Sequence, residues 1–371
     1  MKKYLNDGYA EKIAQKEELD QPNHWFLPHH GGKKKCAEKK TLRIVFDATA
    51  EFEEKSLNNS MLTGPKLQSE LPEILLKFRE RPIALGADIE AMFSRIRLTK
   101  ADARYHRFLM TEPTTGEVEV YQMNRLTFGD AASPFVAMAT LHRTAEDYGG
   151  GQERACRAIK NFYMDDYLDS FDSADEAIRV GRCVKDILRK GDFNLTKWTS
   201  NSAEVRRAFN GEEIVGTRNV SGKGEGQKVL GVTWKNEDDV LIFRINKVEG
   251  LIFTRRGLLS KIAGMFDPLG LASPAITKGK IGLLKLTIAH ADWDETIEEQ
   301  DQRGWIRWLE KLEELKELKI PRCIRPETGE DVESEVHVFR YASEEAFAAV
   351  AYLRSVRKEK HLFSNIIMAK T

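Results

Sequence analysis

Two apolar runs meet at a pair of adjacent carboxylates between Asn161 and Phe171, where the sequence reads NFYMDDYLDSF. Aromatic and aliphatic residues on both sides favour β-strands, whereas Asp165 and Asp166 favour the turn between them. The stretch therefore predicts a β-hairpin with an acidic pair at its tip. Neighbouring aspartates repel each other unless a cation lies between them, and ligands that offer only oxygen favour magnesium or manganese. The pattern is also typical of an ordinary solvated turn, and this alternative stays open on the stretch alone.

The composition is that of a globular chain. Its 371 residues, 41% of them hydrophobic, can bury a sizeable core and predict two or three subdomains. No apolar run approaches the roughly 18 to 20 residues of a membrane span, and the start at Met1 opens into charge instead of a signal-peptide core. We therefore expect an intracellular protein, cytoplasmic or nuclear and not secreted, with no membrane partner.

Other kinds of metal site fit the sequence poorly. The acids at and after Asp165 lack the alternate-residue spacing of an EF-hand calcium loop. His24, His29, His30 and Cys36 are near neighbours, but their spacing matches no zinc pattern. The four cysteines are scattered along the chain and predict neither a zinc ribbon nor a disulfide framework.

A second informative stretch runs from Ile83 to Phe93. An apolar strand leads into Asp88, a short segment follows, and the stretch ends on an aromatic residue. An aspartate at a strand end is often only a helix N-cap, so this signal is weak alone. Together with Asp165 and Asp166 it supplies three carboxylates, a set that fits a two-metal site for nucleotidyl transfer. One divalent ion would activate an attacking 3′-oxygen, and the other would stabilise the leaving pyrophosphate.

The rest of the chain alternates predicted strands with capped helices. Residues 1–24 are polar and helix-prone, and the piece from Ile96 to Leu98 alternates like a strand. Ser133 is the predicted N-cap of a helix that runs to about Tyr148. The other predicted elements are a strand at 42–47, a helix at 69–79, a hairpin across 108–123, a helix after the Ser173/Glu176 capping box, a strand leading to Lys197, strands at 229–234 and 240–245, a helix capped by Thr296 and Glu299, and strands within 336–353.

The formal net charge is zero, so the position of the charges matters more than their sum. Residues 33–40 hold five lysines and one glutamate, which predicts either a solvated loop or a phosphate-facing patch. Residues 244–285 hold eight Lys or Arg against two acids, which makes them the best candidate for a track along a polyanion.

In this order and spacing, the motifs resemble the reverse transcriptases of long-terminal-repeat retrotransposons, specifically the Pao/BEL group. The resemblance covers nearly the whole chain. It rests on the segments WFLPHHG from Trp25, LRIVFDATA from Leu42, SLN from Ser56, GP from Gly64, ADIEAMF from Ala87, FG from Phe128, SP from Ser133, YMDD from Tyr163, LTKWT from Leu195, LGVTW from Leu230, TRRG from Thr254 and FDPLGL from Phe266.

The resemblance implies an α+β fold with the architecture of a right-hand polymerase. Its parts would be fingers, a palm with an antiparallel sheet and packed helices, and a thumb or connection, followed by an incomplete ribonuclease H-like segment. The implied domains are N-terminally incomplete fingers at 1–80, a palm at 81–235 with a fingers insertion near 105–125, a thumb or connection of Pao type at 236–332, and a truncated ribonuclease H-like segment at 333–371.

The resemblance also implies roles for individual residues. Asp88, Asp165 and Asp166 would be the catalytic carboxylates and would bind two Mg²⁺ or Mn²⁺ ions together with the backbone carbonyl of Ile89. Phe93 would lie under the sugar of the incoming nucleotide and exclude a 2′-hydroxyl. The implied nucleotide site comprises Arg43, Ile89, Glu90, Phe93, Phe128, Gly129 and Lys197, with Arg43 on the triphosphate and Lys197 near the leaving phosphates. The implied primer grip comprises Leu230, Gly231, Val232, Thr233 and Trp234.

The implied function is that of an RNA-directed DNA polymerase acting on an RNA or DNA template with a primer and on deoxynucleoside triphosphates. One departure concerns Tyr341, which stands before Ala342 where the ribonuclease H domain of such polyproteins normally has an aspartate. A phenol cannot replace a metal-binding carboxylate at neutral pH, so we expect no ribonuclease H activity. Since the chain resembles a fragment of a longer element, the alternative function is that of a catalytically inactive remnant that binds nucleic acid or protein partners.

Overall fold

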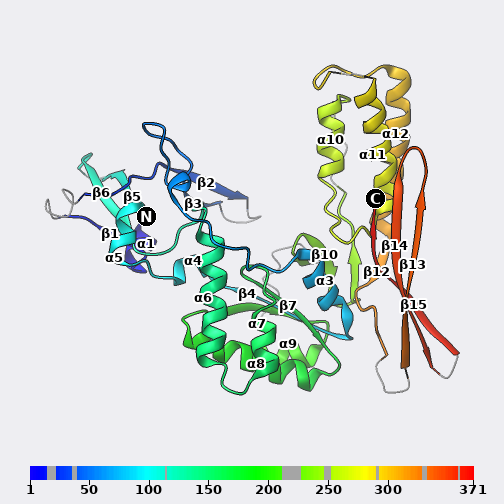
Figure 1. Cartoon of the computed structure of the whole chain (residues 1–371), viewed down its shortest axis with the longest axis horizontal. Helices are drawn as coiled ribbons and strands as arrows, with labels where there is room; N and C mark the ends of the chain where they lie inside the picture. The colour runs from blue at the N-terminus through cyan, green and yellow to red at the C-terminus, as the bar shows by residue number, and fades with distance from the viewer. Residues whose placement is uncertain are drawn as a thin grey trace. The chain divides into compact units, whose positions relative to one another are not determined.

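The computed structural model describes residues 1–14, 22–35, 40–112, 115–210, 227–245, 252–289, 292–327, 332–357 and 360–371 (Figure 1). Helices and short sheets are mixed along the chain, which confirms the predicted α+β class. The chain forms two compact units that are interleaved in sequence. Unit 1 comprises Met1–Ser69, Ala87–Tyr167 and Arg179–Trp198, and unit 2 comprises Glu70–Gly86, Leu168–Ile178 and Thr199–Thr371. The four predicted domains follow a different division, and their boundaries stay predictions.

Unit 1 contains two antiparallel sheets and a set of helices. Strand β2 pairs with β3, and β1, β6 and β5 form a three-stranded sheet in that order. The pairing of β5 with β6 confirms the hairpin predicted across 108–123, although residues 113–114 lie outside the described part. The elements are α1 (Lys2–Asn6), β1 (Ala10–Lys12), β2 (His29–Lys35), β3 (Lys40–Phe46), η1 (Asn58–Ser60), α4 (Met92–Arg95), α5 (Lys100–Ala103), η2 (Arg104–His106), β5 (Arg107–Thr111), β6 (Val118–Met123), α6 (Ser133–Tyr148) and α7 (Glu153–Ile159).

Aromatic side chains from these strands form a core. Phe46, Phe108 and Tyr121 are buried, and the ring centroid of Phe108 lies 5.1 Å from that of Phe46 and 5.7 Å from that of Tyr121. Ring pairs at these separations stabilise a core beyond the area that they bury. The packing fixes the hairpin against β3, the strand that carries Arg43.

Four elements carry residues of both units: β4 (Ile83–Ile89), β7 (Asp166–Phe171), α8 (Ala174–Lys190) and β8 (Leu195–Thr199). The strands form a sheet of order β7-β4-β8. The backbone N–H of Glu176 donates to Ser173 Oγ at 3.2 Å, as the predicted capping box requires. The predicted apolar face of α8 is buried at Ala177, Val180, Val184, Ile187 and Leu188.

Several local predictions are wrong because tertiary pairing overrides local pattern. Of residues 1–14 and 22–24, which the structure describes, Lys2–Asn6 is helical, whereas Ala10–Lys12 pairs with β6; the helix-prone residues 15–21 lie outside the described part. The piece from Ile96 to Leu98 is not a strand, because only Arg97 makes a bridge, to Arg125.

Two predicted helix caps are also wrong. Ser133 is the first residue inside α6, and its hydroxyl donates to the carbonyl of Thr127 at 2.7 Å. Thr296 bridges Thr254 and lies ahead of the helix that it was expected to cap, which begins at Glu299.

Unit 2 contains three long helices and two antiparallel sheets, of order β12-β11-β10-β9 and β13-β14-β15. The strands predicted within 336–353 are confirmed, and β10 pairs with β11. The elements are α3 (Leu71–Glu80), α9 (Ala203–Asn210), β9 (Gln227–Val229), β10 (Val232–Lys235), β11 (Val240–Ile242), α10 (Arg255–Ala263), α11 (Ser273–Ile288), α12 (Glu299–Glu313), η3 (Glu314–Glu317), β12 (Lys319–Pro321), β13 (Val332–Ala342), β14 (Phe347–Arg357) and β15 (Lys360–Lys370).

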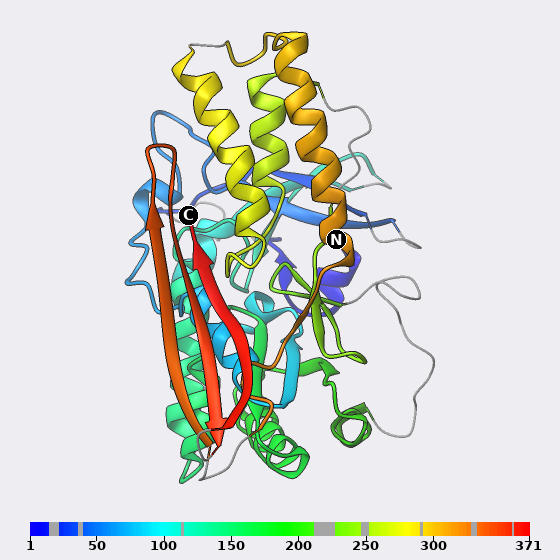
Figure 2. The same ribbon diagram turned by 90° about the vertical axis from the view of Figure 1, so that its right-hand side faces the viewer.

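Helices α10, α11 and α12 run side by side (Figures 1 and 2). Trp305 and Trp308 of α12 are buried against α11, where Gly279 and Gly282 leave room for them. A Cβ at Gly279 would lie 2.4 Å from the ring of Trp308, and one at Gly282 would lie 2.9 Å from that of Trp305. Because Gly279 and Gly282 have no side chains, α12 with its two tryptophans can approach α11 closely.

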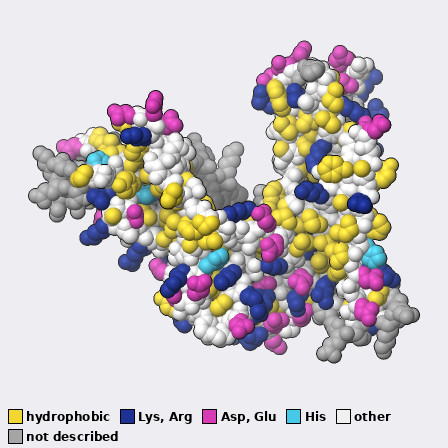
Figure 3. Space-filling view, in the orientation of Figure 1, with side chains coloured by type: hydrophobic (Ala, Val, Ile, Leu, Met, Phe, Trp, Pro, Cys, Tyr) yellow, Lys and Arg dark blue, Asp and Glu magenta, His cyan; other side chains and the backbone are white. Residues whose placement is uncertain are grey.

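The described part of the basic stretch 244–285 includes α10 and most of α11. Arg256 pairs with Asp294 at 2.7 Å, and Lys285 pairs with Glu345 at 2.5 Å. Figure 3 shows hydrophobic side chains gathered over the same helices, with Lys and Arg between them. The stretch thus presents a mixed surface in which some positive charges already have acidic partners, and a polyanion track along it stays a prediction.

Candidate active site

The acidic pair lies on a tight turn that leads into β7. Tyr163 and Asp166 form a bridge in which each backbone N–H donates to the other's carbonyl, at 3.0 and 3.1 Å. Met164, between them, has a φ of 56°, a left-handed conformation that side chains with a Cβ rarely adopt. The predicted hairpin is therefore correct in its turn and second arm but wrong in its first arm, which is a single bridged residue. Asp165 lies in the turn, whereas Asp166 begins the strand.

The sheet brings Asp88 next to this turn. Asp88 is the penultimate residue of β4, the central strand, and β7 is its neighbour. The backbone N–H of Ile89 donates to the carbonyl of Asp165 at 2.8 Å, so the two acidic segments are joined directly. On the other side of β4, Thr196 Oγ1 donates to the carbonyl of Asp88 at 3.3 Å. Three segments far apart in sequence are thereby held at one edge of the sheet.

Lys197 completes this cluster from β8. Its Nζ lies 2.7 Å from Asp88 Oδ2, in a partly exposed ion pair. Lys197 has a φ of 54°, and Ala91, just after β4, has a φ of 52°. With Met164, three non-glycine residues adopt the left-handed conformation around one group of acids. Such backbone strain costs of order 1 to 3 kcal/mol per residue and tends to occur at functional sites.

The neighbouring carboxylates raise the pKa of Asp166. Burial, followed by the charges of Asp165 and Asp88, raises the pKa of Asp166 from 3.8 to about 7, while Lys197 opposes the rise. No three His, Cys, Asp or Glu side chains of the described residues converge tightly enough to form a ready-made metal cluster. The three carboxylates are thus near enough to interact electrostatically, and the ammonium of Lys197 lies beside Asp88.

Two aromatic rings lie beside the acidic edge. The ring centroids of Phe93 and Phe128 are 4.5 Å apart, with Phe93 9% exposed and Phe128 45% exposed. Gly129 follows with a φ of 109°, and a Cβ there would lie 2.8 Å from the carbonyl oxygen of Phe46. Since only glycine fits, the loop can place Phe128 directly against Phe93. The structure therefore brings together these predicted nucleotide-site residues.

Glu90 lies at the exposed end of β4. Its carboxylate pairs with Arg95 at 2.8 Å, and its backbone N–H donates to the carbonyl of Asn194 at 2.9 Å. These contacts fix the segment that links Asp88 to Phe93. Arg43 lies on β3 opposite Gly32, but its side chain falls outside the described part, so its predicted contact with the triphosphate stays a prediction.

The predicted primer grip lies in unit 2 and is a hairpin instead of a strand. Leu230 and Gly231 form the turn between β9 and β10, with φ values of 46° and 84°, and only the residues from Val232 onward are extended. Trp234 is fully buried, and its Nε1 donates to Asp239 Oδ1 at 3.0 Å. Its side chain is therefore part of the core.

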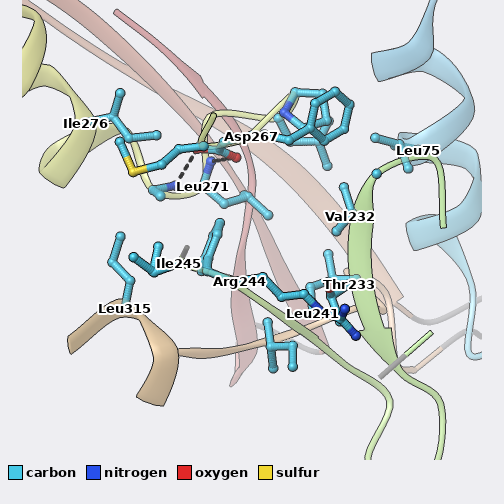
Figure 4. A pocket seen from close by; sticks show the side chains of 18 of the residues that line it. Leu75, Val232, Thr233, Leu241, Arg244, Ile245, Asp267, Leu271, Ile276 and Leu315 are labelled. Carbon is cyan, nitrogen blue, oxygen red and sulfur yellow. Dashed lines mark hydrogen bonds between the residues drawn. The ribbon is translucent and has the colours of Figure 1, made fainter. Parts of the chain in front are cut away.

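A cavity of about 250 Å³ lies in unit 2 and shares no lining residue with the acidic cluster. Figure 4 shows its mainly apolar lining, which includes Leu75, Val232, Leu241, Leu271, Ile276 and Leu315. Asp267 accepts hydrogen bonds from the backbone N–H groups of Leu271 and Ala272, and its burial raises its pKa. The cavity contains no carboxylate set and is therefore a poor candidate for the chemistry.

Sequence reasoning assigned no role to two buried polar groups next to the aromatic pair. His106 and Asp130 bond to each other at 2.8 Å, and Asn58 bonds the backbone on either side of Asp130. Asn58 was noted only as part of a motif. The histidine pairing has no local sequence signal, since its partner lies 24 positions away.

Comparison with known proteins places two families along the chain. Residues 33–205 match the family described as reverse transcriptase (RNA-dependent DNA polymerase). Residues 254–371 match the family described as Pao retrotransposon-like RNaseH-like domain, and this match runs across the predicted boundary after residue 332. The comparison with curated proteins gave no match. None of the described helices is long and apolar enough to cross a membrane.

A solved structure with a similar fold is titled as the foamy viral protease-reverse transcriptase dRH in complex with ds DNA. The TM-score is 0.59 at 16% sequence identity, and the alignment covers 99% of this chain and 53% of that chain. The chain thus spans about half the length of that relative, and at this identity the likeness shows the fold. The fold and the two family matches confirm the predicted resemblance: the chain is similar to the reverse transcriptase and Pao-type regions of a retrotransposon polyprotein.

Proposed function

We propose that this chain is an RNA-directed DNA polymerase of a retroelement, which extends a primer 3′-hydroxyl on an RNA or DNA template with deoxynucleoside triphosphates. The observation that carries the proposal is the convergence of Asp88 with Asp165 and Asp166, which raises the pKa of Asp166 to about 7. Carboxylates that disfavour one another's charge form a site that gains stability from a cation. The reverse transcriptase match over 33–205 contains all three.

The donor set fits divalent ions. Asp88, Asp165, Asp166 and the carbonyl of Ile89 offer only oxygen, as Mg²⁺ and Mn²⁺ prefer. The ion pair of Lys197 with Asp88 supports this fit, since a cation already finds a favourable place there. When bound, two such ions would supply activation of the primer hydroxyl and neutralisation of the leaving pyrophosphate.

The chain's own residues would bind and orient the nucleotide. Because Phe93 is held by Phe128 and by the segment after Asp88, its ring edge would stay where a 2′-hydroxyl would collide with it. Lys197 would leave Asp88 as divalent ions bind and would then be free to neutralise phosphate charge. Arg43 and Gly129 would border the triphosphate and the base. Glu90 would hold Arg95 near the nucleotide through their ion pair.

The proposed partners are a template with its primer and the triphosphates. The hairpin from Leu230 to Trp234 is our candidate for the primer contact, and residues 244–285 for the phosphate backbone. Fingers at 1–80, a palm at 81–235, a thumb or connection at 236–332 and a ribonuclease H-like segment from 333 remain the proposed division.

Primer extension tests the proposal. The chain is incubated with a primed RNA template, deoxynucleotides and Mg²⁺ beside an Asp165→Asn variant, which keeps the shape of the side chain but loses its charge. We expect template-dependent extension by the first protein and at least a hundredfold less by the second, since charged groups at such sites supply several kcal/mol. Template binding without any extension would instead favour a catalytically inactive, nucleic-acid-binding protein. Equal extension by both proteins would overturn the site assignment.

A further inference from the structure

A buried polar network holds the loop that carries Phe128. His106 and Asp130 are 3% and 4% exposed, and His106 Nε2 lies 2.8 Å from Asp130 Oδ2. Thr127 Oγ1 donates to the same carboxylate oxygen at 2.7 Å, and Ser133 Oγ donates to the carbonyl of Thr127 at 2.7 Å. These contacts fix both ends of the loop 127–133.

The partners of His106 determine how many protons the pair needs. Its Nδ1 lies 3.1 Å from the carbonyl oxygen of Asp102, which can only accept, so Nδ1 carries a proton. Its Nε2 faces a carboxylate oxygen, so a second proton must lie between these two atoms. Asp130 Oδ2 already accepts from Thr127 Oγ1, and an ionised oxygen accepts from two donors better than a protonated one, so the second proton is better placed on Nε2. The geometry therefore favours an imidazolium paired with a carboxylate.

The electrostatic surroundings agree with this state. Burial lowers the pKa of His106, but the hydrogen bond and charge of Asp130, with a smaller contribution from Asp102, more than offset it, and the pKa is raised. The charged groups acting on the ring are thus Asp130, from the loop before α6, and Asp102, from α5. When the proton is lost, one ring nitrogen keeps its hydrogen and the other faces an oxygen lone pair at hydrogen-bond distance, either Nε2 against Asp130 or Nδ1 against Asp102. In both tautomers the buried Asp130 carboxylate loses the positive charge of the imidazolium, which is unfavourable and favours movement of the loop.

The same loop is bound from its other side by Asn58. Asn58 Nδ2 donates to the carbonyl of Gly129 at 3.0 Å, and its Oδ1 accepts from the N–H of Ala131 at 2.7 Å. The residues around Phe128 are therefore fixed, while the ring of Phe128 itself stays 45% exposed and lies 4.5 Å from that of Phe93. The position of this ring depends on the loop.

We propose that His106 and Asp130 are positioning residues, whose protonated pair fixes the loop 127–133 so that Phe128 stays against Phe93. When the pair loses its proton, the loop relaxes and Phe128 leaves that position. The hydrogen bonds of the pair run to the loop, through Asp130 itself and Thr127, so we assign its effect on Phe128 to the position of the loop. The consequence for nucleotides, namely weaker binding and weaker exclusion of ribonucleotides, rests on the proposed function.

Fluorine NMR on the whole chain tests the coupling without any activity. 4-Fluorophenylalanine is placed at position 128, or at the exposed Phe52 as a control, and ¹³C-labelled histidine reports the protonation of His106. We expect His106 to titrate above the ordinary pKa of imidazole, with the fluorine signal at 128 changing at the same midpoint and the signal at 52 unchanged. In Asp130→Asn, which removes the charge that holds the proton, both midpoints should fall together. The proposal would be overturned if the fluorine signal at position 128 did not change as His106 titrates. It would also be overturned if the titration midpoint of His106 lay below the ordinary pKa of imidazole.

Kinetics then test the consequence. The KM for a deoxynucleotide should rise at least fivefold above the midpoint measured by NMR, with a smaller change in kcat, and the rise should move to lower pH in Asp130→Asn. Thr127→Val keeps the His106–Asp130 pair but removes the hydroxyl that donates to Asp130. It is the second variant in case Asp130→Asn misfolds, and its KM should rise at a pH between those of the unchanged chain and Asp130→Asn. A KM that is independent of pH in all three proteins would contradict the proposal. If the chain does not polymerise, the proposed function fails, while the NMR result still decides the positioning role.

Discussion

Asp166→Asn should make the folded protein more stable at neutral pH, although it removes a residue that we place in the active site. The pKa of Asp166 is raised from 3.8 to about 7 by burial and by Asp165 and Asp88. A shift of about three pH units corresponds to about 4 kcal/mol at 1.36 kcal/mol per unit. Relaxation and screening by salt reduce this value, so we expect a measured gain of about 1 to 3 kcal/mol.

The sign and the pH window follow from the direction of the shift. Because the folded state holds the proton more tightly than the unfolded state, the stabilising contribution is complete below pH 3.8 and is lost as the pH rises towards 7. Asparagine has no charge to acquire. The advantage of Asp166→Asn over the unchanged chain should therefore be small near pH 4, grow up to about pH 7 and then stay constant.

Urea unfolding followed by circular dichroism between pH 4 and 8.5, without divalent ions, measures this difference. Asp186→Asn, on the exposed side of α8, is the matched control and should show no pH-dependent gain. Mg²⁺ should stabilise the unchanged chain more than Asp166→Asn, because the ion relieves the same repulsion. An equal gain at every pH, or none at pH 8, would refute the electrostatic reasoning.

Three further substitutions test the packing and the sugar contact. Arg322→Met removes a fully buried guanidinium whose donors bind four groups, and should cost about 3 to 5 kcal/mol in urea unfolding, against under about 0.5 kcal/mol for the exposed Arg303→Met. Gly129→Ala should lose about 1 to 3 kcal/mol more than Gly151→Ala, since both have positive φ but only the first meets a carbonyl; equal losses would argue against the clash. Phe93→Ala should raise ribonucleotide incorporation about tenfold or more in primer extension, and unchanged sugar selectivity would remove its assigned role.

Local sequence signals predicted the parts of the fold that depend on local contacts. The helix after Ser173 was predicted correctly because its capping residues and the apolar residues of its buried face lie within one continuous stretch of sequence. The acidic turn was also predicted correctly, since Asp-Asp between apolar runs favours a turn. Its first arm was not, because the residues before Tyr163 pair with no strand of the described part, and pairing cannot be seen in a single segment.

The candidate site was predictable in its composition but not in its contacts. Asp88, Asp165 and Phe93 were named through their motifs, and the sheet order explains why the two acids meet. The contacts of Lys197 with Asp88 and of His106 with Asp130 join segments 109 and 24 positions apart. Neither contact follows from periodicity or from turn chemistry, because each depends on how separate elements pack.

The claim that matters most is that Asp88, Asp165 and Asp166 act together as a site for divalent ions and nucleotidyl transfer. Incorporation of a single deoxynucleotide on a primed RNA template, measured as a function of Mn²⁺ concentration, tests it directly when the whole chain is compared with Asp88→Asn. We predict saturable, metal-dependent incorporation by the unchanged chain and a loss of at least a hundredfold in the variant, with template binding retained by both. Incorporation that is independent of the metal, or equal in the two proteins, would contradict the account.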